Sequence, residues 1–117
     1  MGFEHITFEK KDKVATITLN EPPSNWLTIL MMKEINRVLL DVKMDPTVQL
    51  LVFDAAGGKA FCDGVDVADH TPDKVDEMIF VFHEMFRIMA SLDVTTVALV
   101  NGRSLGGGCE LMAFCDI

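Results

Sequence analysis

Residues 101 to 116 read Asn-Gly-Arg-Ser-Leu-Gly-Gly-Gly-Cys-Glu-Leu-Met-Ala-Phe-Cys-Asp, so three consecutive glycines stand directly before a mostly apolar segment. The apolar run at 96–100 predicts a strand ahead of the glycines, and the segment behind them predicts a helix. Such a junction leaves backbone N–H groups free at the positive end of a helix dipole. Because Gly106, Gly107 and Gly108 have no Cβ, a ligand oxygen can approach this main chain closely.

Glu110 falls in the first turn of that expected helix and can face the same ligand. Backbone donors beside a carboxylate suit chemistry next to a carbonyl group. A tight turn, or close packing of the helix on its strand, is the alternative interpretation of the glycines. A phosphate-binding loop is disfavoured, because no Gly-Lys-Ser/Thr follows and the GxGxxG spacing is absent.

A second glycine-bearing stretch, residues 57–66, follows another apolar run at 50–53. It reads Gly-Gly-Lys-Ala-Phe-Cys-Asp-Gly-Val-Asp. Two strands that each lead into a glycine loop can direct two N–H groups at one carbonyl oxygen, which is what an oxyanion hole requires. An ordinary connection between a strand and a helix is the alternative for this loop.

Both loops resemble signatures of the enoyl-CoA hydratase/isomerase (crotonase) superfamily. Residues 58–67, Gly-Lys-Ala-Phe-Cys-Asp-Gly-Val-Asp-Val, resemble the first signature, and residues 101–111 resemble the second. The opening at 15–23, with Asn25 just beyond, is also similar to the start of that family, so the likeness covers essentially the whole chain. The runs at 22–28 and 62–72 most resemble the cyclohexa-1,5-dienecarbonyl-CoA hydratases of anaerobic aromatic degradation.

The resemblance implies a reversible addition of water to an enoyl- or dienoyl-CoA thioester, with a cyclic diene as the acyl group. The N–H groups of Val65 and Gly107 would form the oxyanion hole, and Glu110 would orient or deprotonate the water. No metal or further cofactor is implied, because coenzyme A is part of the substrate. The CoA portion would be held by Asp66, Val67 and Ala68. From the residues alone, Asp66 is first of all a residue that shapes its loop.

In this chain Val65 stands where the family commonly carries alanine. The family's second glutamate, and the helices that complete its trimers or hexamers, would follow Ile117. We therefore expect residues 1–117 to be the N-terminal part of a crotonase-like domain, truncated before its C-terminal half. Whether this part is active without the remainder is left open. An enoyl-CoA isomerase, another crotonase-type acyl-CoA enzyme, and a non-catalytic acyl-CoA-binding or self-associating fragment are the alternatives.

The composition limits which binding partners and which cellular compartment we expect for this protein. The net charge of −8 disfavours nucleic acid as a partner, because binding to phosphates needs clustered basic residues. Lys59 and Arg103 are the candidates for contacting the CoA phosphates, unless both are simply solvated. Three cysteines without a pairing pattern, and no apolar run near the ~20 residues that span a bilayer, predict a cytoplasmic protein.

Along the chain, the apolar pattern predicts strands at 3–9, 14–20, 49–53 and 96–100, and a helix at 27–43. Thr71 as N-cap and Pro72 as the first helical residue predict a second helix that runs to about 91. The alternation implies an α/β architecture, similar to part of the crotonase ββα spiral. The second helix is expected to bury Val75, Met78, Ile79, Phe82, Met85, Phe86 and Met89.

Other reactive side chains give no competing site. His5, His70 and His83 do not form a metal-binding set, and Arg87 breaks the HExxH spacing. No GxSxG motif is present for a serine hydrolase. Two cysteines flank the glycine loops without a paired histidine in view, which favours small buried thiols over nucleophiles at Cys62 and Cys109.

Overall fold

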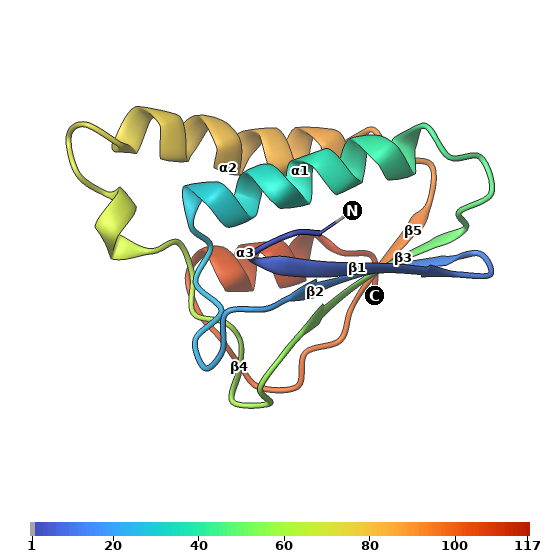
Figure 1. The fold of residues 1–117 in the computed structure, drawn as a ribbon, viewed down its shortest axis with the longest axis horizontal. Coiled ribbons are helices and arrows are strands. Elements are labelled where there is room, and N and C mark those ends of the chain that lie inside the picture. The colour runs from blue at the N-terminus through green and yellow to red at the C-terminus, as the bar shows by residue number, and fades with distance from the viewer. Residues whose placement is uncertain (1) are drawn as a thin grey trace.

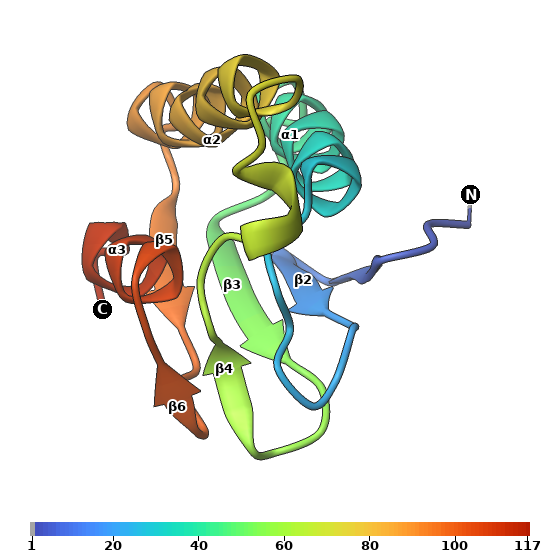
Figure 2. The ribbon, with the colours of Figure 1, turned by 90° about the vertical axis from the view of Figure 1, so that its left-hand side faces the viewer.

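The computed structural model describes residues 2–117 and confirms the α/β class. Its main sheet has four strands in the order β1-β2-β3-β5. The helices α1 (Ile29–Lys43) and α2 (Val75–Ala90) run side by side over one face of this sheet (Figure 1). Helix α3 (Gly107–Phe114) lies beside β5 (Figure 2), and its Phe114 ring contacts the Phe86 ring of α2. The bounds of the main-sheet strands are Ile6–Lys11 (β1), Val14–Leu19 (β2), Leu50–Ala55 (β3) and Thr95–Ala98 (β5).

Strands β1 and β2 form an antiparallel hairpin in which Lys11 pairs with Val14. Ala15, Ile17 and Leu19 are fully buried, as their alternation with Thr16 and Thr18 predicts. The first strand was predicted too early, because it extends to Lys11 and the turn contains only residues 12 and 13. Asp12 adopts a φ of 57° there, a left-handed conformation that a short polar side chain tolerates.

Helix α1 spans Ile29–Lys43, and its N-cap is Thr28, whose side chain accepts a hydrogen bond from the N–H of Met31. The predicted core positions of this helix are all buried: Ile35, Val38, Leu39 and Val42. From α1 the chain passes into β3, which pairs in parallel with both β2 and β5.

Helix α2 spans Val75–Ala90, so the prediction of Thr71 as its N-cap is wrong. The Thr71 hydroxyl donates to the carboxylate of Asp73, 2.5 Å away, instead of accepting from a backbone N–H. Residues 71–74 form a turn closed by a 3.0 Å hydrogen bond from Lys74 N to Thr71 O, and the helix begins after it. The turn therefore takes up the residues that the Thr-Pro pattern assigned to the first helical turn.

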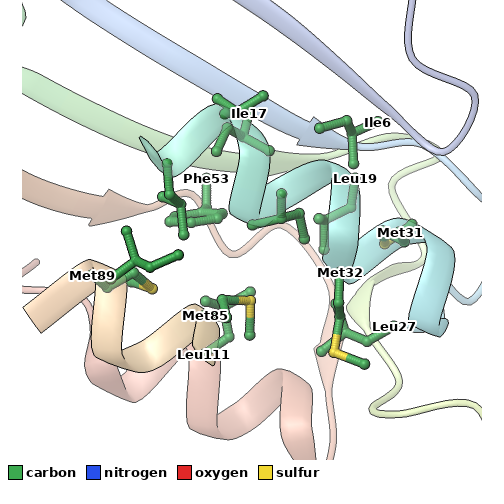
Figure 3. Packing of buried hydrophobic residues seen from close by; sticks show 14 of the residues in the cluster. Ile6, Ile17, Leu19, Leu27, Met31, Met32, Phe53, Met85, Met89 and Leu111 are labelled. Carbon is green, nitrogen blue, oxygen red and sulfur yellow. The ribbon is translucent and has the colours of Figure 1, made fainter. Parts of the chain in front are cut away.

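The packed face of α2 is rotated slightly from the predicted one. Ile79 is 44% exposed, whereas Val81 and Ile88, which the pattern did not single out, are buried. Met78, Met85 and Met89 are buried as expected and belong to the core cluster. Figure 3 shows Met85 and Met89 in this core between the two helices and the sheet. The Val75, Phe82 and Phe86 side chains are partly buried against that core.

The remaining elements build a smaller second layer. Strand β4, Ala60–Cys62, pairs in parallel with β6, Arg103–Ser104, in a two-stranded sheet. A short 3₁₀ helix, η1, spans Val67–Asp69, and α3 spans Gly107–Phe114. Figure 2 shows β4 and β6 side by side, with α3 following β6 directly. Within residues 2–117, no helix is long and apolar enough to cross a membrane.

Candidate functional site

The two glycine loops meet because the strands that lead into them are neighbours. Leu105 N donates to Cys62 O at 3.0 Å, and Arg103 N donates to Lys59 O at 3.2 Å. Both β4 and β6 therefore end at the same edge, where the chain turns into residues 63–66 on one side and 105–107 on the other (Figure 2).

Glycine is required where these loops touch. Gly64 has a φ of 105°, and a Cβ there would lie 3.1 Å from Leu105 O and 3.5 Å from Gly107 N. A Cβ on Gly108 would overlap the carbonyl of Cys62 and lie 2.7 Å from the Cys62 Cβ. Such close approach is possible only without a side chain. The main chains of the two loops are thus in direct contact.

The N–H of Val65 is directed away from its neighbouring segment. Val65 forms a parallel bridge with Leu27, but the hydrogen bonds of this bridge use Gly64 O, at 2.8 Å, and Asp66 N, at 3.1 Å. In such a bridge the central residue directs its own N–H to the opposite side. No hydrogen bond recorded among residues 2–117 uses the N–H of Val65.

The N–H of Gly107 is free for a different reason. Gly107 is the first residue of α3, where backbone donors have no intrahelical acceptor. Gly106 precedes it at φ 51° and ψ −123°, a conformation open essentially to glycine alone. In the described part of the chain, the first N–H of α3 that finds an acceptor is that of Gly108, which donates to Leu105 O at 2.9 Å.

Glu110 lies one turn into α3, and its side chain is exposed. Together with Phe86, Ala113 and Phe114 it lines a depression of about 320 Å³. Phe86 contacts Phe114 edge to face, with ring centroids 5.0 Å apart. The carboxylate of Glu110 therefore stands at the border between solvent and an aromatic wall.

Phe82 continues this aromatic wall to the junction of the two loops. A Cβ on Gly107 would lie 3.1 Å from Phe82 Cε1 and 3.2 Å from Val65 Cγ2. The Phe82 and Phe86 rings are also in edge-to-face contact, with centroids 5.0 Å apart. Apolar side chains of Phe82 and Val65 thus lie beside Gly107, where the two loops are in contact.

The residues after Val65 form a capped turn. The Asp66 carboxylate accepts a 3.0 Å hydrogen bond from the N–H of Ala68 and caps η1, which agrees with its interpretation as a loop-shaping residue. Val67 is 73% exposed, beside that turn. A role for Asp66, Val67 and Ala68 in holding CoA stays a prediction, and the N–H of Ala68 is already in use.

Arg103, a candidate for contacting a CoA phosphate or a solvated residue, forms an ion pair with Asp63 while its side chain stays 49% exposed. Its role toward CoA stays a prediction. Its Nε donates to Asp63 Oδ1 at 2.6 Å and its Nη2 to Asp63 Oδ2 at 2.7 Å. The Arg103 guanidinium lowers the pKa of the Asp63 carboxyl, and the carboxylate raises the pKa of Arg103. Lys59 is exposed, and no ion pair recorded for residues 2–117 includes it.

Sequence reasoning missed the pair of Asp63 and Arg103. The available signal was a carboxylate just ahead of the glycine in one loop, at Asp63, and a guanidinium just ahead of the glycines in the other, at Arg103. The signal is weak because the two residues are 40 positions apart. Their contact follows only from the parallel pairing of β4 and β6.

The cysteines differ from one another. Cys62 is buried, and burial raises the pKa of its thiol to about 11, which argues against a nucleophile. Cys109 is exposed, so its expected burial is wrong. Across the part of the chain that the structure describes, no three His, Cys, Asp or Glu side chains gather as metal ligands could.

Known proteins resemble this chain in sequence and in fold. The enoyl-CoA hydratase/isomerase family profile matches residues 9–117. A crotonyl-CoA hydratase from Syntrophomonas wolfei subsp. wolfei is 34% identical over 120 residues, covering 99% of this chain and 46% of the relative. A short-chain-enoyl-CoA hydratase from Clostridium acetobutylicum is 32% identical over 121 residues, covering 100% of this chain and 46% of the relative.

Among solved structures, Pseudomonas aeruginosa DspI superposes with a TM-score of 0.92 at 28% sequence identity, covering 98% of this chain and 45% of that one. The chain thus spans about half the length of the curated relatives it matches, and its fold corresponds to part of the crotonase fold. The expected resemblance to this superfamily is confirmed, whereas the finer likeness to cyclohexadienecarbonyl-CoA hydratases stays a prediction. The profile match covers nearly the whole chain, which therefore belongs to the enoyl-CoA hydratase/isomerase family.

Proposed function

We propose that the protein works as an enoyl-CoA hydratase, a lyase that adds water reversibly to the double bond of an enoyl- or dienoyl-CoA thioester. The observation that carries this proposal is the junction of the two loops. There, the unpaired N–H groups of Val65 and Gly107 stand on main chains in direct contact, and Glu110 follows on the same helix.

The thioester carbonyl oxygen would accept hydrogen bonds from both N–H groups. When water adds to C3, the electron pair of the C=C bond moves through C2 and charge develops on that oxygen. Both hydrogen bonds then strengthen, and losing one such donor typically costs about 2.7–4 kcal/mol of transition-state stabilisation. The positive end of α3 at Gly107 favours the same charge.

Glu110 would take the proton from the attacking water, because its carboxylate is exposed beside the aromatic wall and can reach both solvent and acyl group. The C–O bond forms as the water O–H bond breaks, and the resulting enolate takes a proton at C2. The Glu110 carboxyl, protonated in the first step, is one source of that proton.

For the acyl group we propose a planar, apolar substrate, with a cyclic dienoyl-CoA as the preferred case. The edge-to-face rings of Phe82, Phe86 and Phe114 support this choice, since aromatic surfaces pack well against a flat conjugated ring. The CoA portion would lie beside Asp66, Val67 and Ala68. Lys59, for which the structure of residues 2–117 records no ion pair, is our candidate for contacting its phosphates.

Two broader proposals accompany this activity. The first is a homo-oligomer, to which exposed apolar side chains around β5, β6 and α3 contribute where the remainder of a longer chain does not cover them; they include Leu99, Val100, Leu105, Phe114 and Ile117. The three free cysteines support a cytoplasmic location, where thiols remain reduced.

The test is a hydration assay with the protein in its longest natural form that carries residues 1–117. Crotonyl-CoA and cyclohexa-1,5-diene-1-carbonyl-CoA are the substrates, and loss of the absorbance of the conjugated thioester reports turnover. We expect Glu110→Gln to abolish turnover, while Glu9→Gln, which removes an exposed carboxylate from β1, leaves it unchanged. Full activity of Glu110→Gln would exclude the assigned role of this carboxylate.

An enoyl-CoA isomerase is the second candidate, and the description of the matching family includes it. An isomerase moves a double bond without adding water. Analysis of the crotonyl-CoA product mixture for a 3-hydroxyacyl-CoA, with a 3-enoyl-CoA as a parallel substrate, separates the two activities.

A further inference from the structure

We propose that Asp63 and Arg103 are positioning residues that hold the N–H groups of Val65 and Gly107 at the spacing the thioester oxygen requires. The inference rests on the proposed function of these N–H groups. Asp63 immediately precedes Gly64 and Val65, and Arg103 is the first residue of β6, which leads to Gly107. The ion pair therefore joins the two loops directly ahead of the proposed donors.

The geometry of the contact fixes orientation as well as distance. The two parallel hydrogen bonds, 2.6 and 2.7 Å long, hold the guanidinium and the carboxylate in one plane. A single-point contact, such as a lysine ammonium makes, would leave the loops free to rotate about it. The bidentate pair thus restrains both the separation of the loops and their relative tilt.

The hydrogen bonds between the two strands provide only part of this restraint. Strand β6 has only two residues, and the register of β4 and β6 shifts between Ala60 and Cys62. Outside the ion pair, β4 and β6 are joined near the loops by the hydrogen bonds Arg103 N to Lys59 O and Leu105 N to Cys62 O. Short, irregular pairing of this kind is open to local distortion. The side-chain pair adds a constraint to this short pairing and to the close main-chain contacts at Gly64 and Gly108.

Asp63 is itself held in place from the other side. Its side chain is 6% exposed, its N–H donates to Ser24 O at 3.0 Å, and the Ser24 hydroxyl adds to the lowering of its pKa. Arg103, at 49% exposure, is the more exposed partner. Asp63 therefore serves as the fixed anchor, and Arg103 connects the second loop to it.

This difference in burial predicts unequal effects of the single variants. Arg103→Met leaves a nearly buried carboxylate without its cation, which is costly because the charge cannot regain full hydration. Asp63→Asn leaves a half-exposed guanidinium that water can solvate. We expect Arg103→Met to disturb the loops more than Asp63→Asn, and Arg103→Lys to fall between wild type and Arg103→Met.

The test combines kinetics with two spectroscopic measurements on the same protein in its longest natural form. In crotonyl-CoA hydration, we expect Arg103→Lys and Asp63→Asn to lower kcat by roughly tenfold or more, below the ~10²–10³ for complete loss of a donor, with KM changed less than threefold. In the bound complex, the C=O stretch of crotonyl-CoA carrying ¹³C at the thioester carbonyl should move back toward its frequency in water. Lys10→Met, which breaks the exposed pair of Lys10 and Asp45 far from the loops, is the matched control and should change neither reading.

Amide resonances separate failure of this inference from failure of the proposed function. If wild type neither binds nor hydrates crotonyl-CoA, the proposed function fails. The inference is then decided by the ¹H–¹⁵N shifts of Val65 and Gly107 in the unliganded protein. The inference is supported if Arg103→Lys changes the chemical shifts of these two amides more than those of the other backbone amides. Unchanged amides, or an active enzyme whose kcat and carbonyl stretch are unaffected, would overturn it.

Discussion

Replacing Gly107 with proline and, separately, with alanine isolates the contribution of one backbone N–H. Gly107 is the first residue of α3, the helical position at which proline is best tolerated, so the proline removes the N–H at a site that accepts its φ angle. Alanine keeps the N–H and adds the same Cβ. In both variants this Cβ lies 3.1 Å from Phe82 Cε1 and 3.2 Å from Val65 Cγ2, contacts that two side chains can relieve by small shifts.

The magnitude follows from this comparison. In the alanine variant the added Cβ acts on the free energy of unfolding: overpacking costs about 1–3 kcal/mol, and the ~1 kcal/mol gain in helix propensity over glycine offsets part of it. The proline variant also loses one oxyanion donor, which raises the activation free energy by about 2.7–4 kcal/mol and lowers kcat about 10²–10³-fold. The ratio of kcat between the alanine and proline variants should therefore be at least about a hundredfold.

The assay is steady-state hydration of crotonyl-CoA, with urea unfolding of each variant to show that both are folded at the assay temperature. The ratio of the two kcat values is the quantity of interest, because the added Cβ is common to both variants. Values of kcat within threefold of each other, in two folded proteins, would refute the assignment of Gly107 as a donor.

Three further predictions concern packing, thiol reactivity and pH. Leu111→Ala, at a fully buried position, should lower the free energy of unfolding by about 2–5 kcal/mol, while Leu40→Ala, at 50% exposure, should stay within ~0.5 kcal/mol of wild type in the same urea titration. A thiol-specific reagent at pH 7 should label Cys109 first and leave Cys62 unmodified in the folded protein, since burial raises the Cys62 pKa to about 11; equal labelling rates would contradict this. The Asp63 carboxyl should titrate below its ordinary pKa of 3.8, so the stability it contributes is present above that pH and is lost as pH falls through the lowered value; a ¹³C titration should show its pKa rising when its guanidinium partner is replaced by methionine.

Local patterns in the sequence were sufficient to predict most of the elements. The alternation in β2 places Ala15, Ile17 and Leu19 in the core, and the helical spacing of Ile35, Val38 and Leu39 places α1 correctly. Each of these patterns depends on burial that repeats over at least two periods. Patterns of that kind are the most informative ones in a single sequence.

Features set by one competing contact could not be predicted in the same way. The Thr-Pro-Asp pattern at 71–73 is typical of a helix start, but the hydroxyl of Thr71 bonds the carboxylate of Asp73 and the helix begins at Val75. The exposure of Ile79 follows from how α2 rests on α1, which the periodicity of α2 alone leaves undetermined. For Thr71 the competing acceptor lies two residues away within the same pattern, and for Ile79 the deciding partner lies on another element.

The candidate site also contains some features that the sequence predicts and others that depend on contacts between distant residues. The glycines that bring the loops together and free the N–H of Gly107 can be identified from their order in the sequence. The contact between Asp63 and Arg103 depends on which strands are neighbours, and this information is non-local. The free N–H of Val65 likewise depends on its bridge to Leu27.

The most direct test of the central claim is a titration of the ¹⁵N-labelled protein with crotonyl-CoA, followed through its backbone amide resonances. The account predicts that the amides of Val65 and Gly107 shift more than any others and move downfield, as N–H groups do when they gain a strong acceptor. Binding that leaves these two amides unmoved, while resonances elsewhere shift, would contradict it.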